Sequence, residues 1–351
     1  MKLLSLSDSY INAEDMQRGL APLASLGIEI ENRHWHHPNL VEITRDNLAI
    51  EKGGPEAVAL PPELCANLAE FDIVITQFAP ISRWFLEAAR KLKVLASLRS
   101  GMENVDMAFA TSRGVTVMNT PGRLSRAVAE FTVAMILAEM RNVGRSHARL
   151  VRGVWDRSFP NSSDIPELYH RTIGLVGYGA VGQMVAGFLR GFECRILAYD
   201  PFFKGDPGTT RMTDLPTLMK ESDVVSLHAR MSQETMNLIG AAELALMKPS
   251  AILVNTARSR LIHEPSLIRT LQEHRIMGAA LDVFDDEPLP PDHPFTKMDN
   301  VTLTTHLAGS TRDAFRNTPG LMAGHLTRML RGEKNLPVLN GVQPTLRAAQ
   351  A

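Results

Sequence analysis

The sequence predicts an α/β protein with two parallel-sheet domains, and three observations lead to this fold class. Short apolar runs alternate with stretches of helical spacing along most of the chain. The segment from Thr172 to Asp200 reads as a strand, a glycine-rich turn, a helix and a second strand. Polar and charged residues recur where the predicted strands end, which is the edge at which open parallel sheets bind ligands.

The first 118 residues alternate between predicted strands and helices and therefore form a separate α/β domain. Strands are expected at residues 3–6, 28–30, 73–75, 94–96 and 115–118. Helices are expected at residues 13–26, 61–68, 82–92 and 107–112. Pro121-Gly122 marks the expected end of this domain.

The rest of the chain begins with a strongly apolar helix at residues 127–140 and an irregular polar segment at residues 145–166. That segment carries Trp155 and Phe159, which either contact a neighbouring molecule or anchor the loop on its own domain. After Asp200 the alternation continues. Strands are expected at residues 224–227, 252–254, 278–283 and 301–304, and helices at residues 215–221, 241–247, 265–272 and 311–330.

The glycine-rich turn predicts a dinucleotide site. Its first glycine allows a tight turn, its second lets backbone approach a pyrophosphate, and its third lets the next helix sit close to the strand. The free N–H groups at the start of that helix favour an anion. The expected cofactor contacts are Gly177, Tyr178, Gly179, Ala180, Val181 and Gly182. The alternative is a glycine-rich turn in an ordinary α/β protein.

Asp200 ends the second strand of this segment, about 20 residues beyond the glycines, where a carboxylate would bind a ribose hydroxyl. A carboxylate at this point repels the additional phosphate of NADP. The sequence therefore favours NAD as the cofactor and disfavours NADP.

Charge, hydropathy and cysteine content limit the binding partners and the cellular compartment to be expected for this chain. A net charge of −1 over 351 residues gives no reason to expect a nucleic acid or an anionic membrane as partner. No apolar run approaches a membrane span, and the N-terminus lacks the apolar core of a signal peptide. Cys65 and Cys194 lie far apart, which fits a reducing cytoplasm.

His34 and His36 share a strand face without a third ligand beside them, so we expect no metal.

Several segments, in order, resemble the D-isomer-specific 2-hydroxyacid dehydrogenase family in its phosphoglycerate dehydrogenase-like form. They are RSGMENVD, VMNTPGRLSRAVAE, GLVGYGAVG, AYD, SDVVSLHA, LVNTAR, ALDVFDDEP and LTTHLAGST, and they cover most of the chain from Arg99 to Thr311. The resemblance implies an NAD-dependent oxidoreductase that interconverts a 2-hydroxy acid, expected as the D-isomer, and its 2-keto acid by hydride transfer.

The resemblance also implies roles for individual residues. His306 would be the acid–base, Glu287 would accept a hydrogen bond from its other ring nitrogen, and Arg258 would hold the substrate carboxylate. Backbone N–H groups at Ser100 and Gly101 would also bind the substrate. Further cofactor contacts are expected at His228, Thr256, Ala257, Asp282 and Gly309, with Asp282 on the nicotinamide carboxamide. Taken singly, each could be a loop residue or a cap; the joint pattern favours the functional interpretation.

The family's layout implies two doubly wound domains. A flavodoxin-like substrate domain would comprise residues 1–118 and 308–351, and a Rossmann NAD-binding domain at residues 119–307 would be inserted in it. The family also implies a homodimer, formed through the helix at residues 127–140 and the arm after it, which favours a partner contact for Trp155.

The match is imperfect at some positions. Thr76-Gln77-Phe78-Ala79-Pro80 lacks the arginine and serine of relatives that act on phosphoglycerate, although Arg83 or Arg99 could compensate. Arg230 stands where the family usually has proline. Glyoxylate, hydroxypyruvate, phosphoglycerate and larger 2-keto acids all stay open as substrates. The alternative from another class is a dinucleotide-sensing, corepressor-like interaction protein on the same fold.

Overall fold

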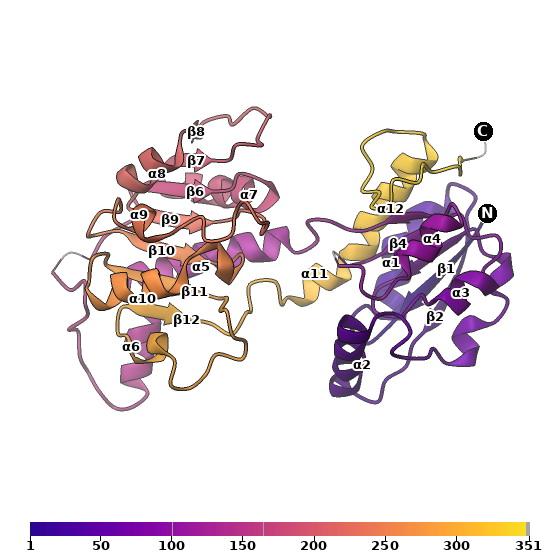
Figure 1. The fold of residues 1–351 in the computed structure, drawn as a ribbon, viewed down its shortest axis with the longest axis horizontal. Helices are drawn as coiled ribbons and strands as arrows, with labels where there is room; N and C mark the ends of the chain where they lie inside the picture. The colour runs from indigo at the N-terminus through magenta and orange to yellow at the C-terminus, as the bar shows by residue number, and fades with distance from the viewer. Residues whose placement is uncertain (100, 164, 349–351) are drawn as a thin grey trace. The chain divides into compact units, whose positions relative to one another are not determined.

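The structure is a computed structural model that describes residues 1–99, 101–163 and 165–348. The chain forms two compact units (Figure 1). The N-terminal unit comprises Met1–Arg123 together with the chain from Thr311 onward, and the central unit is Leu124–Ser310. Each unit is described by itself.

The N-terminal unit contains a parallel sheet of order β2-β1-β3-β4-β5. Its strands are β1 (Lys2–Ser7), β2 (Glu29–His34), β3 (Ile73–Thr76), β4 (Val94–Ser97) and β5 (Thr116–Met118). Its helices are α1 (Ala13–Ala24), α2 (Leu40–Gly53), α3 (Arg83–Ala88), α4 (Met107–Ser112), α11 (Arg312–Arg316) and α12 (Thr318–Leu330). Successive strand residues face opposite sides, so helices cover both faces: α1 and α12 pack on one, and α2, α3 and α4 on the other.

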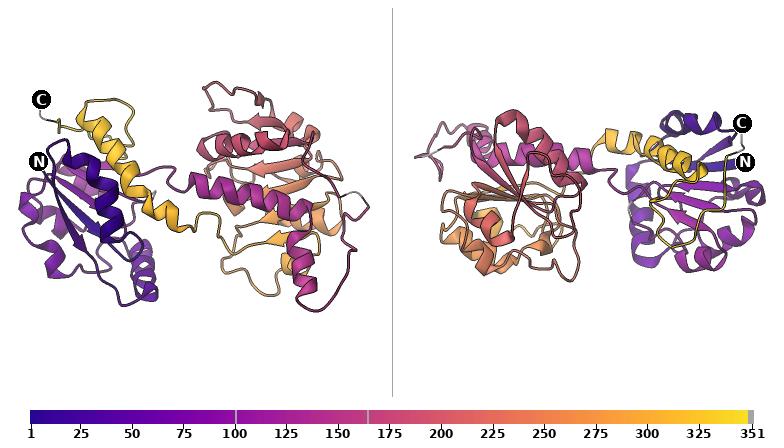
Figure 2. Two further views of the ribbon diagram at one scale, coloured as in Figure 1. Left: turned by 180° about the vertical axis from the view of Figure 1, so that it is seen from behind. Right: turned by 90° about the horizontal axis from the view of Figure 1, so that it is seen from above.

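The central unit contains a seven-stranded parallel sheet of order β12-β11-β10-β9-β6-β7-β8 (Figures 1 and 2). Its strands are β6 (Thr172–Val176), β7 (Arg195–Tyr199), β8 (Arg211–Met212), β9 (Val224–Leu227), β10 (Ile252–Asn255), β11 (Gly278–Leu281) and β12 (Val301–Leu303). Its helices are α5 (Ser125–Met140), α6 (Val143–Leu150), α7 (Ala180–Leu189), α8 (Leu215–Glu221), α9 (Ala241–Leu244) and α10 (Glu264–Gln272). All the strands point the same way, so their carboxyl ends lie along one edge.

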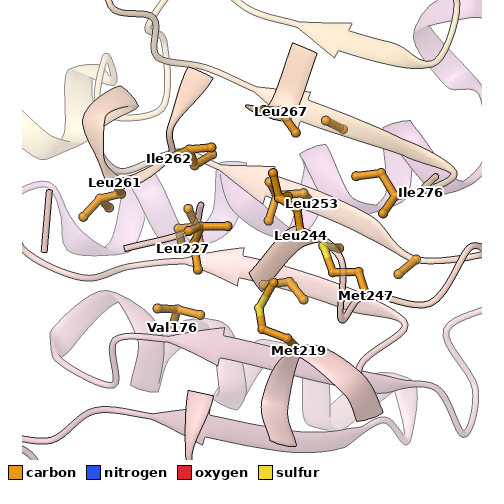
Figure 3. Close-up of a cluster of buried hydrophobic side chains, with 14 of the residues drawn as sticks. Val176, Met219, Leu227, Leu244, Met247, Leu253, Leu261, Ile262, Leu267 and Ile276 are labelled. Carbon is orange, nitrogen blue, oxygen red and sulfur yellow. The ribbon is translucent and has the colours of Figure 1, made fainter. Parts of the chain in front are cut away.

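The core of the central unit lies on both faces of this sheet. Leu227 and Leu253 pack beneath α8, α9 and α10 (Figure 3). Ile252 and Val254 face the opposite side, where they pack with residues of α5 and α7. This two-sided burial explains the continuous apolar runs of these strands. The predicted fold class, two parallel-sheet α/β domains, is confirmed.

Several elements differ from the sequence-based expectation. The helix expected at residues 311–330 breaks at Asn317, because Pro319 lacks the N–H that would continue α11 into α12. The helix expected at residues 61–68 is two short 3₁₀ turns. The segment expected to be irregular from residue 145 lies partly in α6, an eight-residue helix that buries none of its residues. α2 was not predicted, since only Ile43 and Ile50 of it are buried.

No helix within the described ranges is both long and apolar enough to cross a bilayer. The described residues also contain no group of three or more histidine, cysteine, aspartate or glutamate side chains that could hold a metal ion. The cytoplasmic location stays a prediction.

Candidate active site

The glycine-rich turn lies between β6 and α7. Gly177 has a φ of +96°, and a Cβ there would come within 2.5 Å of the Ala229 nitrogen. A Cβ on Gly182 would come within 2.4 Å of the Gly177 carbonyl oxygen. Gly179 caps α7, and a Cβ on it would meet nothing within 4 Å. Two of the glycines therefore permit close packing, and the third leaves the backbone open to a ligand.

A cavity of about 540 Å³ opens beside this turn, a size common for small-molecule sites. Gly177, Gly179, Asp200 and His228 line it, as the sequence predicts for cofactor contacts. Other residues that line the cavity were not predicted as cofactor contacts. They follow β7 and β9: Pro201, Phe202, Ala229, Arg230, Ser232 and Thr235. Their position just after strand ends was the signal that could have identified them.

The carboxylate of Asp200 is held by backbone. Its Oδ2 accepts a hydrogen bond from the Tyr178 N–H at 2.8 Å, and its Oδ1 accepts one from the Phe202 N–H at 2.9 Å. These bonds tie the end of β7 to the glycine turn and fix the orientation of the carboxylate beside the cavity. The Tyr178 side chain is buried and donates from its hydroxyl to Thr210 at 2.7 Å, and the Tyr178 carbonyl accepts a hydrogen bond from Gln183 Nε2 at 3.0 Å.

His228 follows β9 and lines the same cavity. Its Nε2 lies 3.0 Å from the Ser226 hydroxyl, while its Nδ1 is buried without a hydrogen-bond partner. Burial lowers the pKa of His228 to about 4, so the ring is neutral near pH 7. The cavity therefore contains a neutral imidazole with one nitrogen still free to bind a ligand.

His306 and Glu287 form a hydrogen-bonded pair. His306 follows β12 in the left-handed region, with a φ of +54°. Its Nδ1 lies 2.8 Å from Glu287 Oε2, and Glu287 Oε1 accepts a 3.0 Å bond from the Phe284 N–H. Burial raises the pKa of Glu287, but hydrogen bonds from His306 and Phe284 and the charges of His306 and Arg258 outweigh it and leave that pKa below its usual value. Glu287 is therefore ionised, and it orients the ring.

Asp282 is fully buried just after β11 and holds the turn that carries His306. Its Oδ1 accepts hydrogen bonds from the Thr304 hydroxyl at 2.6 Å and the Leu307 N–H at 2.8 Å, and its Oδ2 accepts one from the Ala308 N–H at 2.9 Å. The Asp282 carboxylate thus positions the turn that carries His306. The structural role expected for it from the sequence was only that of a loop residue or a cap. Its contact with a nicotinamide stays a prediction.

Arg258 follows β10 and is exposed, with Nη1 donating to the Ala257 carbonyl at 2.7 Å. Asn255 fixes the turn around it, because its Nδ2 donates to the Arg258 carbonyl and its Oδ1 accepts from the Ala257 N–H. The next side chain, Thr256, hydrogen-bonds Thr132 of α5 at 2.7 Å. Asn255 is a positioning residue that the sequence analysis missed.

The remaining predicted residues are less informative. Gly309 packs so closely on Leu124 that a Cβ would come within 2.9 Å of its Cδ1. Ala180 and Val181 form the first turn of α7. Gly101 belongs to the N-terminal unit, where a Cβ would come within 2.5 Å of the Glu103 carboxylate. Ser100 lies outside the described residues.

Comparison with known proteins gives consistent results. A sequence model described as the D-isomer specific 2-hydroxyacid dehydrogenase, NAD binding domain, matches residues 133–308. The chain is 40% identical over 284 residues to a glyoxylate reductase of Thermofilum pendens, which spans 79% of this chain and 84% of that protein. The chain belongs to the D-isomer specific 2-hydroxyacid dehydrogenase family. It is accordingly an NAD(P)-dependent oxidoreductase with the 2-hydroxyacid dehydrogenase or reductase activity of that family.

Two further relatives of this dehydrogenase broaden the comparison. A D-3-phosphoglycerate dehydrogenase of Methanocaldococcus jannaschii is 36% identical, over 79% of this chain but only 53% of its own length. The crystal structure of D-lactate dehydrogenase with NAD⁺ from Lactobacillus jensenii matches with a TM-score of 0.72 at 26% identity, over 97% of this chain and 99% of that one. The family assignment made from the sequence motifs is confirmed.

Proposed function

We propose that this dehydrogenase reduces a 2-keto acid to a D-2-hydroxy acid with NADH, and that His306 is its acid–base. The observation that carries the proposal is the 2.8 Å hydrogen bond between His306 Nδ1 and Glu287 Oε2. This pair follows the carboxyl ends of strands in the sheet whose same edge carries the glycine turn. A histidine oriented by a carboxylate, at the sheet edge that also carries the glycine turn, suits coupled hydride and proton transfer.

His306 would move the proton through its Nε2 atom. Its Nδ1 faces Glu287, so Nε2 is the nitrogen left to donate a proton to the keto oxygen. When bound, NADH would supply the hydride for the keto carbon. In the reverse direction Nε2 takes the hydroxyl proton, and ionised Glu287 stabilises the resulting imidazolium.

Arg258 would hold the carboxylate of the substrate. Its guanidinium is exposed, and the Asn255 side chain fixes the turn that presents it. Its planar fork matches a carboxylate better than a lysine ammonium would. The proposed roles of Ser100 and Gly101 rest on the family resemblance.

NAD is the proposed cofactor form. The open backbone at Gly179 and the N–H groups at the start of α7 fit a pyrophosphate. The carboxylate of Asp200, held in place by two backbone N–H groups, fits a ribose diol and opposes a ribose phosphate. In this proposal the central unit binds the cofactor and carries Arg258 and His306, and the N-terminal unit supplies further substrate contacts.

A homodimer is the proposed assembly. Exposed apolar side chains gather on α6 and the segment after it, and Trp155 is 83% exposed. The others are Val143, Leu150, Val151 and Val154. An exposed apolar surface of this kind commonly marks a protein interface.

The test of the function is steady-state oxidation of NADH with a panel of 2-keto acids that includes glyoxylate, the acid in the name of the Thermofilum relative. We expect turnover of at least one acid, with NADH preferred to NADPH. The Arg258→Met variant should raise KM, because it loses the carboxylate contact. Absence of turnover with every acid, despite NADH binding, would contradict the proposal.

A further inference from the structure

The N-terminal unit buries polar side chains without partners at the carboxyl edge of its sheet. Asp8 follows β1 and Gln77 follows β3, and both are essentially inaccessible to solvent. Neither amide atom of Gln77 makes a hydrogen bond, nor does Oδ2 of Asp8. Nε and Nη1 of Arg123, at the end of the same unit, are likewise buried and unpartnered. Buried polar groups are nearly always hydrogen-bonded, so this set needs an explanation.

The backbone around these groups is firmly held. Asp8 Oδ1 accepts hydrogen bonds from the Tyr10 and Ile11 N–H groups at 2.8 and 2.9 Å. Asn104 Nδ2 donates to the carbonyl oxygens of Gln77 and Ala79, both at 3.1 Å. These hydrogen bonds fix the backbone next to the Asp8 and Gln77 side chains. The unpartnered atoms therefore do not result from an irregular, weakly held loop.

Aromatic rings join the members of the cluster. The Arg123 guanidinium lies over the Phe315 ring at 5.0 Å, and the Tyr10 ring lies 5.2 Å from Phe315 and 5.4 Å from Phe78. Asp8 and Arg123 attract each other electrostatically, yet in the described part of the chain they make no ion-pair contact.

The charges near Asp8, Gln77 and Arg123 determine whether a carboxylate or a phosphate is the better ligand. Burial and the nearby charge of Arg99 lower the pKa of Arg123 to about 10, which still leaves it cationic near pH 7. Arg99 itself is already engaged, with Nη1 on Asn47 at 2.7 Å and Nη2 on Glu51 at 2.8 Å. One unpaired guanidinium beside a carboxyl group fits a singly charged carboxylate better than a doubly charged phosphate.

A purely structural role does not explain the arrangement. Leaving a buried amide such as that of Gln77 unpaired destabilises a fold, and an apolar side chain of similar size would avoid the penalty. Unpaired polar groups of this kind are expected where a ligand completes them.

We propose that Asp8, Gln77 and Arg123 bind the end of the substrate remote from its keto carbon, and that this end carries a second carboxylate. Arg123 pairs with the carboxylate, the Gln77 amide donates a hydrogen bond to it, and the Asp8 carboxyl group donates a second one when it carries a proton. The inference rests on the proposed function and narrows it to 2-keto and 2-hydroxy dicarboxylic acids.

The test compares acids that differ only at the far end. We would measure kcat/KM with NADH for 2-oxopentanedioate, for 2-oxohexanoate, for phosphohydroxypyruvate and for glyoxylate, which has no far end. We expect the dicarboxylate to exceed 2-oxohexanoate at least tenfold and to exceed the phosphorylated acid. Equal use of the two long acids, or preference for the phosphorylated one, would overturn the inference.

Variants of Arg123 and Gln77 test whether these residues cause the preference for the dicarboxylate. Arg123→Met should lower kcat/KM for the dicarboxylate ten- to a hundredfold, mainly through KM, and should lower it far less for glyoxylate. The control is Arg90→Met, because Arg90 is an exposed arginine of the same unit outside the cluster. Gln77→Leu removes the unpaired amide, so it should keep or raise the melting temperature while reducing the preference. An unchanged preference in both Arg123→Met and Gln77→Leu would contradict the inference.

Turnover of glyoxylate distinguishes a failure of this inference from a failure of the proposed function. Turnover of glyoxylate without any preference for a dicarboxylate would overturn the inference and leave the proposed function standing. No turnover of any acid by the wild-type protein would overturn the proposed function, and the inference would fall with it.

Discussion

The carboxylates that follow β7 and β11 accept hydrogen bonds from backbone N–H groups. Asp200 ties the glycine turn to β7, and Asp282 holds the turn that carries His306. Each therefore has a local structural role, in addition to the ligand role proposed for it. Substitution at either position will change geometry as well as chemistry, so variants need both an activity and a stability measurement.

The proposed preference for NAD over NADP rests on Asp200. The Asp200→Ala variant removes the negative charge beside the ribose position, so it should reduce the ratio of kcat/KM for NADH over NADPH by at least tenfold. Steady-state kinetics with both cofactors measure the ratio, and melting temperatures report the structural cost. An unchanged ratio in a folded variant would show that another residue selects the cofactor.

Asp8 should make the stability of the protein depend on pH. Burial raises the pKa of its carboxyl from 3.8 to about 6, so between these values the folded state keeps a proton that the unfolded state has released. The contribution of Asp8 to the free energy of unfolding is therefore fully present below about pH 4 and is lost as the pH rises through about 6. The total loss in the free energy of unfolding is about 3 kcal/mol.

Urea unfolding of the wild type and of Asp8→Asn between pH 4 and 7 measures this dependence. The difference in unfolding free energy between the two proteins should shift in favour of the variant as the pH rises. A difference that does not change with pH would rule out a raised pKa at Asp8.

Single residues also show what the sequence could and could not predict. His306 and Glu287 were predicted as a pair because each lies in a recognisable motif, and they are hydrogen-bonded. Arg123 and Gln77 lie in segments that were compared with the family, but nothing in those segments predicts that they are grouped with Asp8. The pairing of β1 with β3, which lie far apart in the sequence, brings Asp8 and Gln77 to one sheet edge. That proximity arises only from tertiary structure, which no local pattern encodes.

At the scale of elements, α7 depends on a close approach to the strand before it. The Gly182→Ala variant places a Cβ 2.4 Å from the Gly177 carbonyl oxygen, so the helix has to move away from the glycine turn. We expect a lower melting temperature and at least tenfold weaker NADH binding, measured by fluorescence titration.

Gly187→Ala is the matched control in the same helix. A Cβ at Gly187 meets nothing within 4 Å, and alanine favours the helix by about 1 kcal/mol over glycine. This variant should bind NADH like the wild type and unfold at the same or a higher temperature. Equal behaviour of the two variants would contradict the packing role of Gly182.

Elements were predictable where burial imposed a pattern. β9 and β10 are buried on both faces and were expected at nearly their observed positions. α2 buries only two residues, and α6 is eight residues long and buries none, so neither helix has a long stripe of buried apolar residues to mark it in the sequence. Their helical structure depends on capping and neighbours; Asn39, for example, caps α2 by accepting from the N–H groups of Val41 and Glu42.

At the scale of the whole molecule, the exposed apolar surface around α6 predicts self-association. The Trp155→Ser variant removes a side chain that is 83% exposed, so it should weaken a dimer without lowering the stability of the protomer. Light scattering coupled to size exclusion, over a range of protein concentrations, measures the mass of both proteins. A monomeric wild type at every concentration would contradict the proposed assembly.

The central claim is that His306 moves the proton while other residues of the central unit bind the cofactor. The most direct measurement is kcat of His306→Ala with the best acid of the panel, alongside its dissociation constant for NADH. We predict that kcat falls by at least a thousandfold, while the dissociation constant changes less than threefold, because the glycine turn and Asp200 remain intact. Turnover within tenfold of the wild type would contradict the assignment of His306 as the acid–base.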